Sequence, residues 1–146
     1  MSSDKKICVK MIIEVAGRPP EYLTKTLNEI IEKINEEKGV NVEDKKVNEP
    51  VVMKDQKDFY TSFAEVEIKI ENMSILTVLI LKYMPAHIEI IEPELIAVAN
   101  NDWNDILNEF ARRLHHYDEV ARVMQTEKVI LENKLKALLP KEEKKE

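Results

Sequence analysis

The chain has 146 residues, of which 44% are hydrophobic and 34% are charged, and its formal net charge is −6. This length predicts one compact domain with an extension. The acidic balance argues against nucleic-acid binding as the main role, because phosphate contacts need a basic surface. A single cysteine, Cys8, excludes an internal disulfide. Residues 1–6 are polar and no apolar run is long enough to cross a bilayer, so we expect a cytoplasmic protein without membrane contact.

The first third of the chain has the pattern of a strand, a turn and a helix. Residues 7–15 alternate apolar and polar side chains, which predicts a strand with one apolar face. Gly17 and the two prolines after Arg18 predict a turn that opens a helix. Residues 21–38 then carry apolar side chains at helical spacing, with Gly39 as the expected terminator: Leu23, Leu27, Ile30, Ile31 and Ile34.

The middle of the chain predicts two more strands. Residues 40–47 indicate a short, polar edge strand, and residues 48–57 read as a loop because they carry Pro50 and mixed charges. Residues 60–71 alternate strictly and predict a long strand. Its core side is expected to be formed by Ser62, Ala64, Val66, Ile68 and Ile70.

A short apolar helix and a last strand are predicted next. Asn72 can cap a helix over residues 73–83, although the β-branched residues in this run leave a strand open. Residues 86–92 lie between two prolines and alternate as a strand does, with Ile88 and Ile90 on one side. Residues 94–101 fit more than one kind of element, and Asn100, Asn101 or Asp102 is expected to cap the long helix that follows.

This order of elements predicts an α+β fold, a ferredoxin-like split β-α-β sandwich over residues 1–93. Both short helices are expected on one face of an antiparallel sheet. The other face is expected to be mostly wet, because it carries polar side chains: Lys10, Glu14, Glu65, Glu67, Lys69, His87 and Glu89.

Residues 94–139 predict a long C-terminal helix with a coiled-coil pattern. From residue 103 to residue 138, apolar residues recur at alternating steps of four and three, which is a heptad repeat with its a and d positions filled. Rings at Trp103, Phe110 and Tyr117 predict that the first part packs on its own domain. Residues 140–146 read as a charged, disordered tail.

The distal part of this helix is the predicted interaction surface, which we call the distal stripe: Ala121, Met124, Lys128, Leu131, Leu135 and Leu138. Val120, Val123 and Ile130 widen it, which favours a bundle or a broad groove over a narrow two-stranded zipper. Lys128 at a core position would specify register or partner. We therefore expect a homodimer or a higher homo-oligomer, with a protein partner as the other possibility.

The segment from Glu14 through Gly17, Arg18 and the two prolines to Glu21, with the helix and then Gly39-Val40-Asn41-Val42-Glu43, resembles the opening of an ACT domain. The resemblance covers about residues 7–92 and implies the same β-α-β-β-α-β fold. It also implies an effector site for an amino acid or similar small molecule beside the first turn, with Gly17, Arg18, Glu21 and Asn41 as its residues. Pro20 stands where the family commonly has a glycine, and proline has no N–H to donate.

A few other polar side chains are candidates for binding or catalysis. Arg18 before a helix start could bind a carboxylate or a phosphate. His87 with the glutamates of the open sheet face could hold a metal, although salt-bridged acids explain the pattern better and we expect no metal there. The histidines at 115 and 116 point about 100° apart on a helix and read as a solvated face. Cys8 lacks an activating base and reads as inert.

The sequence carries no Ser-His-Asp, P-loop or dinucleotide pattern. We therefore expect a non-enzymatic, self-associating regulatory or adaptor module without a cofactor. Two alternatives stay open at this point. One is a small-molecule sensor that uses the turn at residues 17–21, and the other is a minor metal-dependent enzyme on the open sheet face.

Overall fold

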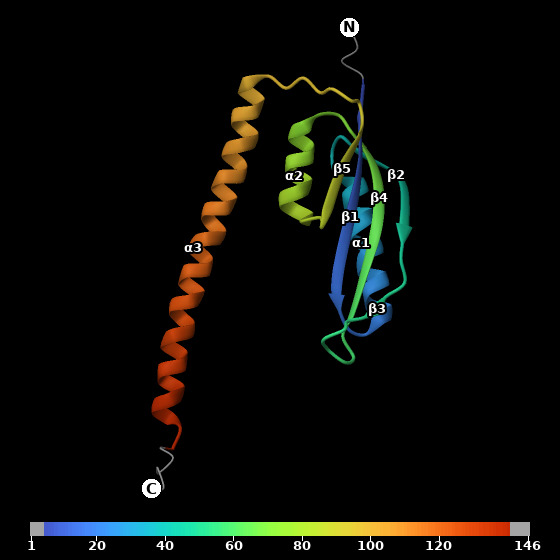
Figure 1. Ribbon diagram of the computed structural model, residues 1–146. Coiled ribbons are helices and arrows are strands. Elements are labelled where there is room, and N and C mark those ends of the chain that lie inside the picture. Colours follow the sequence, from blue (N-terminus) through green and yellow to red (C-terminus); the bar gives the residue numbers. More distant parts are fainter. Residues whose placement is uncertain (1–4, 141–146) are drawn as a thin grey trace. The chain divides into compact units, whose positions relative to one another are not determined.

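The computed structural model describes residues 5–140, and the chain divides into two compact units at Ile106 and Leu107 (Figure 1). The predicted tail of residues 140–146 lies, apart from Pro140, outside the described residues. In order, the elements are β1 (Ile7–Gly17), α1 (Pro20–Glu36), β2 (Val40–Val47), β3 (Val51–Val52), β4 (Tyr60–Ile70), α2 (Met73–Tyr83), β5 (His87–Glu92) and α3 (Asn100–Leu138).

The sheet has the strand order β2-β4-β1-β5, and every neighbouring pair is antiparallel. Its centre is the pair of 11-residue strands β1 and β4, which stay in register from Ile7 opposite Ile70 to Gly17 opposite Tyr60. Helices α1 and α2 each connect two strands that have one antiparallel strand between them. The predicted α+β fold with an antiparallel sheet is therefore confirmed.

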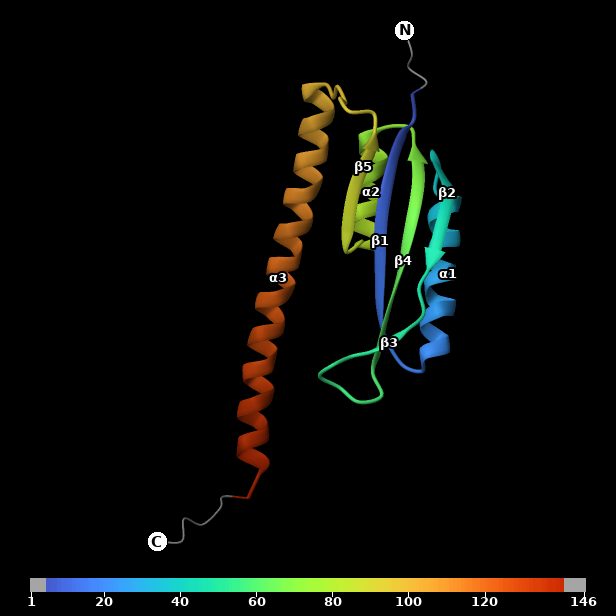
Figure 2. The ribbon, with the colours of Figure 1, turned by 45° about the vertical axis from the view of Figure 1, so that its right-hand side comes forward.

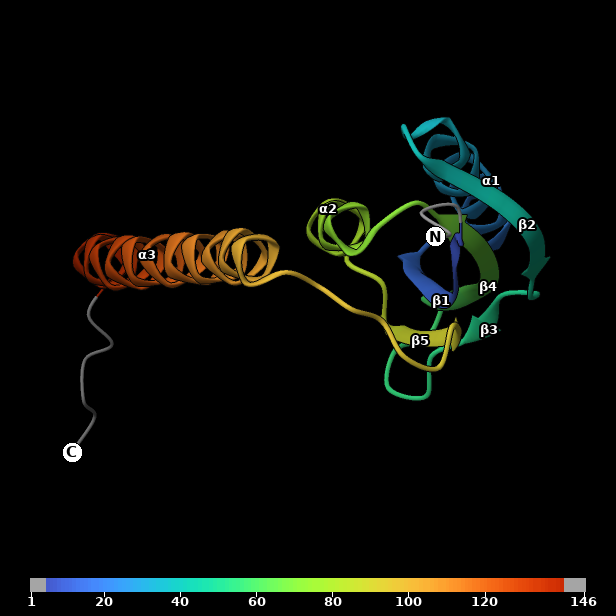
Figure 3. The same cartoon turned by 90° about the horizontal axis from the view of Figure 1, so that it is seen from above.

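The core lies between one face of this sheet and the two short helices. Figure 3 shows α1 and α2 on the same side of the sheet. Alternate residues of β1 and β4 supply the sheet side, because side chains of a strand alternate between its faces. The most deeply buried members come from both strands and both helices: Val9, Met11, Leu27, Ile34, Ala64, Val66, Ile68, Ile70 and Leu79.

The predicted helix at residues 73–83 is confirmed. The side chain of Asn72 accepts a hydrogen bond from the backbone N–H of Ile75 at 3.1 Å, as expected of an N-cap. The helix ends at Met84, which adopts the left-handed conformation. Gly39 has a φ of +77°, and a Cβ there would lie 2.5 Å from the side chain of Ile75. This glycine therefore both makes the turn after α1 and lets α2 approach it.

Two local predictions were wrong. The predicted loop at residues 48–57 contains the short strand β3, where Val51 and Val52 pair with the first residues of β4. Two β-branched residues are too few to show the periodicity of a strand. They form one here because they pair with the edge of β4 at its first residues. The long helix begins at Asn100, and the N–H of Trp103 donates to the carbonyl of Ala99 at 3.0 Å. Ala99 therefore holds the cap position that the sequence assigned to a polar residue.

The first unit extends beyond the predicted boundary at residue 93. Residues 93–99 form no helix or strand, but Ile96 packs against the core. Ile106, in the second turn of α3, is buried with 6% exposure. The connecting segment and the start of α3 therefore belong to the first unit. The prediction that α3 packs on its own domain as far as Tyr117 stays a prediction.

Helix α3 itself is continuous over 39 residues, which corresponds to about 58 Å at ~1.5 Å per residue (Figure 2). The helix ends two residues before Pro140, as the sequence indicates, and the N–H of Leu139 still bonds to the carbonyl of Leu135. Residues from Leu107 onward form the second unit. No helix among the described residues is both long enough and apolar enough to cross a membrane.

Candidate functional site

Three of the four predicted effector residues lie together at the turn between β1 and α1. Gly17 ends β1, and Glu21 lies in the first turn of α1. Pro19 is the N-cap and makes no side-chain hydrogen bond, and the N–H of Tyr22 already donates to the carbonyl of Pro19 at 3.1 Å. Arg18 is exposed and forms no ion pair with any residue of the described chain. This turn therefore offers one free guanidinium to solvent.

The fourth residue, Asn41, does not join that turn within one chain. It lies opposite Lys69 of β4, whereas Gly17 lies opposite Tyr60 at the other end of the same strand. Nine residues of strand correspond to about 30 Å. The side chain of Asn41 donates instead to the carboxylate of Glu43 at 2.7 Å. Within one chain Asn41 therefore lies apart from Gly17, Arg18 and Glu21, and an effector site that contains all four residues stays a prediction.

The open face of the sheet carries weakly paired charges. The ammonium of Lys10 lies 3.9 Å from a carboxylate oxygen of Glu65, and both side chains are partly exposed. Among the described residues, no group of three or more His, Cys, Asp or Glu side chains could hold a metal. This arrangement gives no support to the metal-enzyme alternative built on His87.

Cys8 lies on this open face, as predicted, but it is buried with 7% exposure. Its thiol donates to a carboxylate oxygen of Glu67 at 3.3 Å. Burial first, and then this hydrogen bond, raise the pKa of the Cys8 thiol above its ordinary value. Because the thiolate is the reactive form, the site suppresses nucleophilic chemistry at this sulfur.

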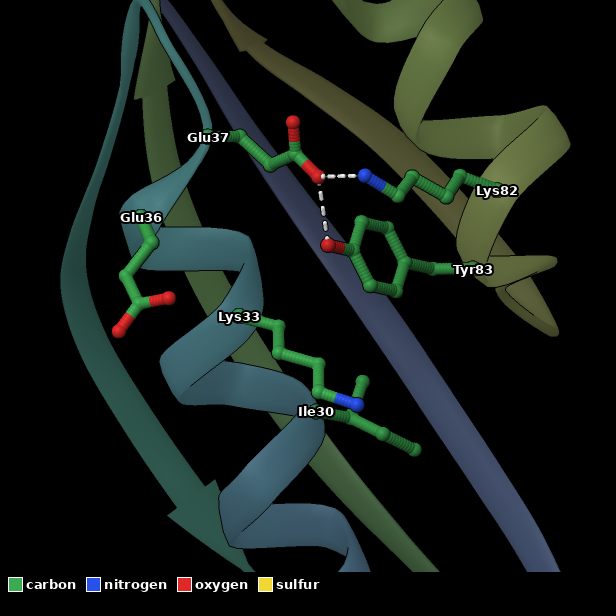
Figure 4. Close-up of a pocket in the computed structure, with 6 residues that line it drawn as sticks. All are labelled: Ile30, Lys33, Glu36, Glu37, Lys82 and Tyr83. Carbon is green, nitrogen blue, oxygen red and sulfur yellow. Dashed lines mark hydrogen bonds and ion pairs between the residues drawn. The ribbon is translucent and has the colours of Figure 1, made fainter.

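A cleft between the C-terminal ends of α1 and α2 escaped the sequence analysis (Figure 4). One carboxylate oxygen of Glu37 accepts from the ammonium of Lys82 at 2.6 Å and from the hydroxyl of Tyr83 at 2.7 Å. These two donors lower the pKa of Glu37, and burial with the same contact raises the pKa of Tyr83. Lys33 and Ile30 complete the wall of the cleft.

This cluster acts as a tie between the two helices. Its residues are more than 40 positions apart in the chain, so neither helix pattern alone reveals the contact. Two lysines and two glutamates line the cleft, which leaves it without a net charge to attract a charged ligand. One oxygen of the Glu37 carboxylate accepts from both donors, which gives this residue a structural role.

The distal stripe is an exposed apolar feature of the second unit. Exposure is 62% for Met124, 64% for Leu131, 57% for Leu135 and 82% for Leu138. The side chain of Lys128 is 65% exposed and lies 3.9 Å from Glu132, one turn further along α3. Met124, Leu131 and Leu135 line a shallow, mainly apolar depression with Glu127, Lys128 and Glu132 at its margins.

Some of the other charged side chains of this unit form pairs along α3 at helical spacing. Asp118 pairs with Arg122, and His115 pairs with Glu119, each one turn apart. Such exposed pairs contribute only tenths of a kcal/mol each. They therefore support the helix without covering its apolar face.

Comparison with known proteins identifies the family. A family model for the MJ0538 family matches residues 8–143. The chain belongs to the MJ0538 family. The match includes both units, so the globular fold and the long helix are parts of one family architecture. No curated protein matches the chain. No solved structure matches it either.

Proposed function

We propose that this MJ0538-family protein is a non-enzymatic regulatory or adaptor module that self-associates through the distal stripe of α3. The observation that carries the proposal is a heptad repeat whose aliphatic side chains are more than half exposed over several turns. Soluble proteins rarely leave a contiguous apolar surface of this kind open unless a partner covers it. Coiled-coil association of the distal stripe is the most direct way to bury it.

The globular unit fits the same proposal as a ferredoxin-like sandwich that the helix brings into an assembly. Its strand order supports this assignment, and the opening from Gly17 to Glu21 supports an ACT-like origin. The one cysteine of the chain, Cys8, is buried and donates its thiol proton to Glu67, which does not favour a nucleophilic role. A role in bringing copies together therefore suits this unit better than chemistry.

The test is the oligomeric state of the wild-type protein and of the Leu131→Asp/Leu135→Asp variant. We expect light scattering to show a dimer or higher oligomer at micromolar concentration and a monomer for the variant. Circular dichroism should show that the strands and short helices of the variant remain folded. A wild-type monomer at high concentration would overturn the proposal of self-association.

A second candidate function is small-molecule sensing at the turn of residues 17–21. The guanidinium of Arg18, which is exposed next to a helix start and has no ion pair among residues 5–140, favours it. Arginine binds carboxylates and phosphates with two parallel hydrogen bonds. A metabolite screen by thermal shift tests it, because a ligand of the folded state raises stability by RT ln(1 + [L]/Kd).

A further inference from the structure

The charges beside the distal stripe contain information about how two copies of α3 would meet. With Leu107, Leu114, Ala121, Lys128 and Leu135 at position a, the flanking g positions include Glu127 and Lys134. The flanking e positions include Gln125 and Glu132. Residues at e and g contact the partner helix and set orientation and register. Glu127 and Lys134 are free to do so, because neither forms an ion pair within the described helix.

A parallel, in-register pair places like charges against each other. Lys128 then faces Lys128 of the second copy across the core, and each Glu127 faces Glu132 at the next e position. The one favourable contact, between Arg113 and Asp118, lies more than three turns before Leu131, at ~3.6 residues per turn. Charges of one sign in direct contact disfavour an assembly. The parallel arrangement is therefore opposed at the centre of the distal stripe.

An antiparallel pair has one register that avoids these conflicts. In it, Lys128 lies opposite Leu131 of the second copy, Met124 lies opposite Leu135, and Ala121 lies opposite Leu138. Positions g then face g, so that Glu127 of each copy meets Lys134 of the other. Gln125 meets Glu132 on the opposite side, where an amide can donate to a carboxylate. The one small residue of the seam, Ala121, meets the large Leu138, and no like charges are in contact.

Neighbouring antiparallel registers are less favourable. A shift of one heptad in one direction brings Glu127 against itself and Asp118 against Glu132. The same shift in the other direction brings Lys134 and Glu132 each against itself. Two registers with longer overlaps place Lys128 opposite an aromatic ring of the second copy, Tyr117 in one and Phe110 in the other. The register with Phe110 gains a contact between Arg113 and Glu127, but it also brings Asp118 against itself.

We infer that residues 121–138 of α3 pair antiparallel with the same residues of a second copy, with Glu127 facing Lys134 across the two-fold axis. This rests on the proposed self-association and gives its orientation. The overlap excludes the three rings in the first part of α3, which suit a two-stranded seam poorly. The register also gives Lys128 a role. The aliphatic part of the Lys128 side chain covers Leu131 of the second copy, while its ammonium group reaches solvent.

Charge reversal distinguishes the two orientations by the sign of its effect. Glu127→Lys creates two contacts between lysines in the antiparallel pair, but it creates two favourable contacts with Glu132 in the parallel pair. We expect the dimer Kd measured by sedimentation to rise roughly tenfold, and Glu127→Lys/Lys134→Glu to restore it at low salt. Asn133→Lys, on the outer f position, is the control and should leave Kd unchanged. An unchanged or lower Kd for Glu127→Lys overturns the inference.

A distance measurement gives an independent readout. A spin label on Ala137→Cys, in a Cys8→Ser background, lies level with residue 122 of the second copy in the antiparallel register. The two labels are then separated by about 22 Å along the axis, at ~1.5 Å per residue, whereas parallel helices hold them level with each other, with only the width of the helix pair between them. The short distance in a stable dimer overturns the orientation and leaves self-association standing. A wild-type monomer overturns both.

Discussion

Helices α1 and α3 carry the same kind of apolar stripe, but only one of the two stripes is covered. In α1, Leu23, Leu27 and Ile34 are each at most 3% exposed, because the stripe lies on the sheet. In α3, Leu131 and Leu135 are 64% and 57% exposed. An apolar stripe at helical spacing thus indicates that one face of a helix is suited to burial. Which element buries that face depends on the rest of the chain.

The difference follows from length and connection. α1 has 17 residues and is bounded by two strands of one sheet, so its stripe cannot avoid the core. α3 has 39 residues, and from Leu107 onward no other described element belongs to its unit. One stripe therefore stabilises the fold, and we propose that the other serves assembly. The predictions below test this division.

The sharpest test makes one substitution in both helices. Leu27→Ala removes a fully buried side chain and should lower the free energy of unfolding of the globular unit by about 2–5 kcal/mol. Leu131→Ala should leave that free energy nearly unchanged and instead weaken association. Urea unfolding at two protein concentrations measures both. The division between the two stripes is wrong if the effect of Leu27→Ala on unfolding depends on protein concentration and the effect of Leu131→Ala does not.

A smaller effect is expected at the start of α2. Asn72→Ala removes the side chain that bonds to the N–H of Ile75, and N-cap losses of this type cost about 1 kcal/mol. Asn72→Ser keeps an oxygen acceptor and serves as the matched control. Thermal unfolding should rank wild type and Asn72→Ser above Asn72→Ala. Equal stability of all three would mean that solvent replaces the cap.

Much of this architecture is visible in the sequence. Period-two alternation located β1 and β4, and helical spacing located α1 and α3, because each of these elements has one face committed to apolar contact. Asn72 and Pro85 located α2 even though its β-branched residues suit a strand. Local chemistry at the ends of an element can therefore decide what hydropathy leaves open.

The candidate sites were harder to predict, because they depend on register and on contacts between distant elements. Asn41 belongs to the correct strand, but only pairing with Lys69 reveals that it lies far from Gly17. The tie of Glu37 to Lys82 and Tyr83 joins two helix ends that no local pattern relates. β3 is too short to have a pattern at all.

The tie between α1 and α2 should make stability depend weakly on pH. The pKa of Glu37 is lower in the folded state, so its contribution is present above the unfolded pKa and is lost as pH falls through the folded one. Tyr83→Phe removes one of its two donors and should cost about 1 kcal/mol at neutral pH. Denaturant midpoints between pH 3 and pH 7 measure it. The variant should show a shallower loss on acidification, and an identical pH profile would argue against the tie.

The smallest change in stability is expected at Arg18, which is the only arginine in the first 111 residues. Its side chain is exposed and forms no ion pair in the described chain, so Arg18→Lys should change the free energy of unfolding by less than about 0.5 kcal/mol. Lysine keeps the charge but loses the planar pair of donors, so binding of a carboxylate or phosphate effector, or of an acidic partner, should weaken. Calorimetric titration with any compound that raises the melting temperature of the wild type measures this loss. A large loss of stability with unchanged binding would instead show that Arg18 holds the turn in place. Arg18 would then have a structural role, as the buried residues of α1 do, and no role in binding.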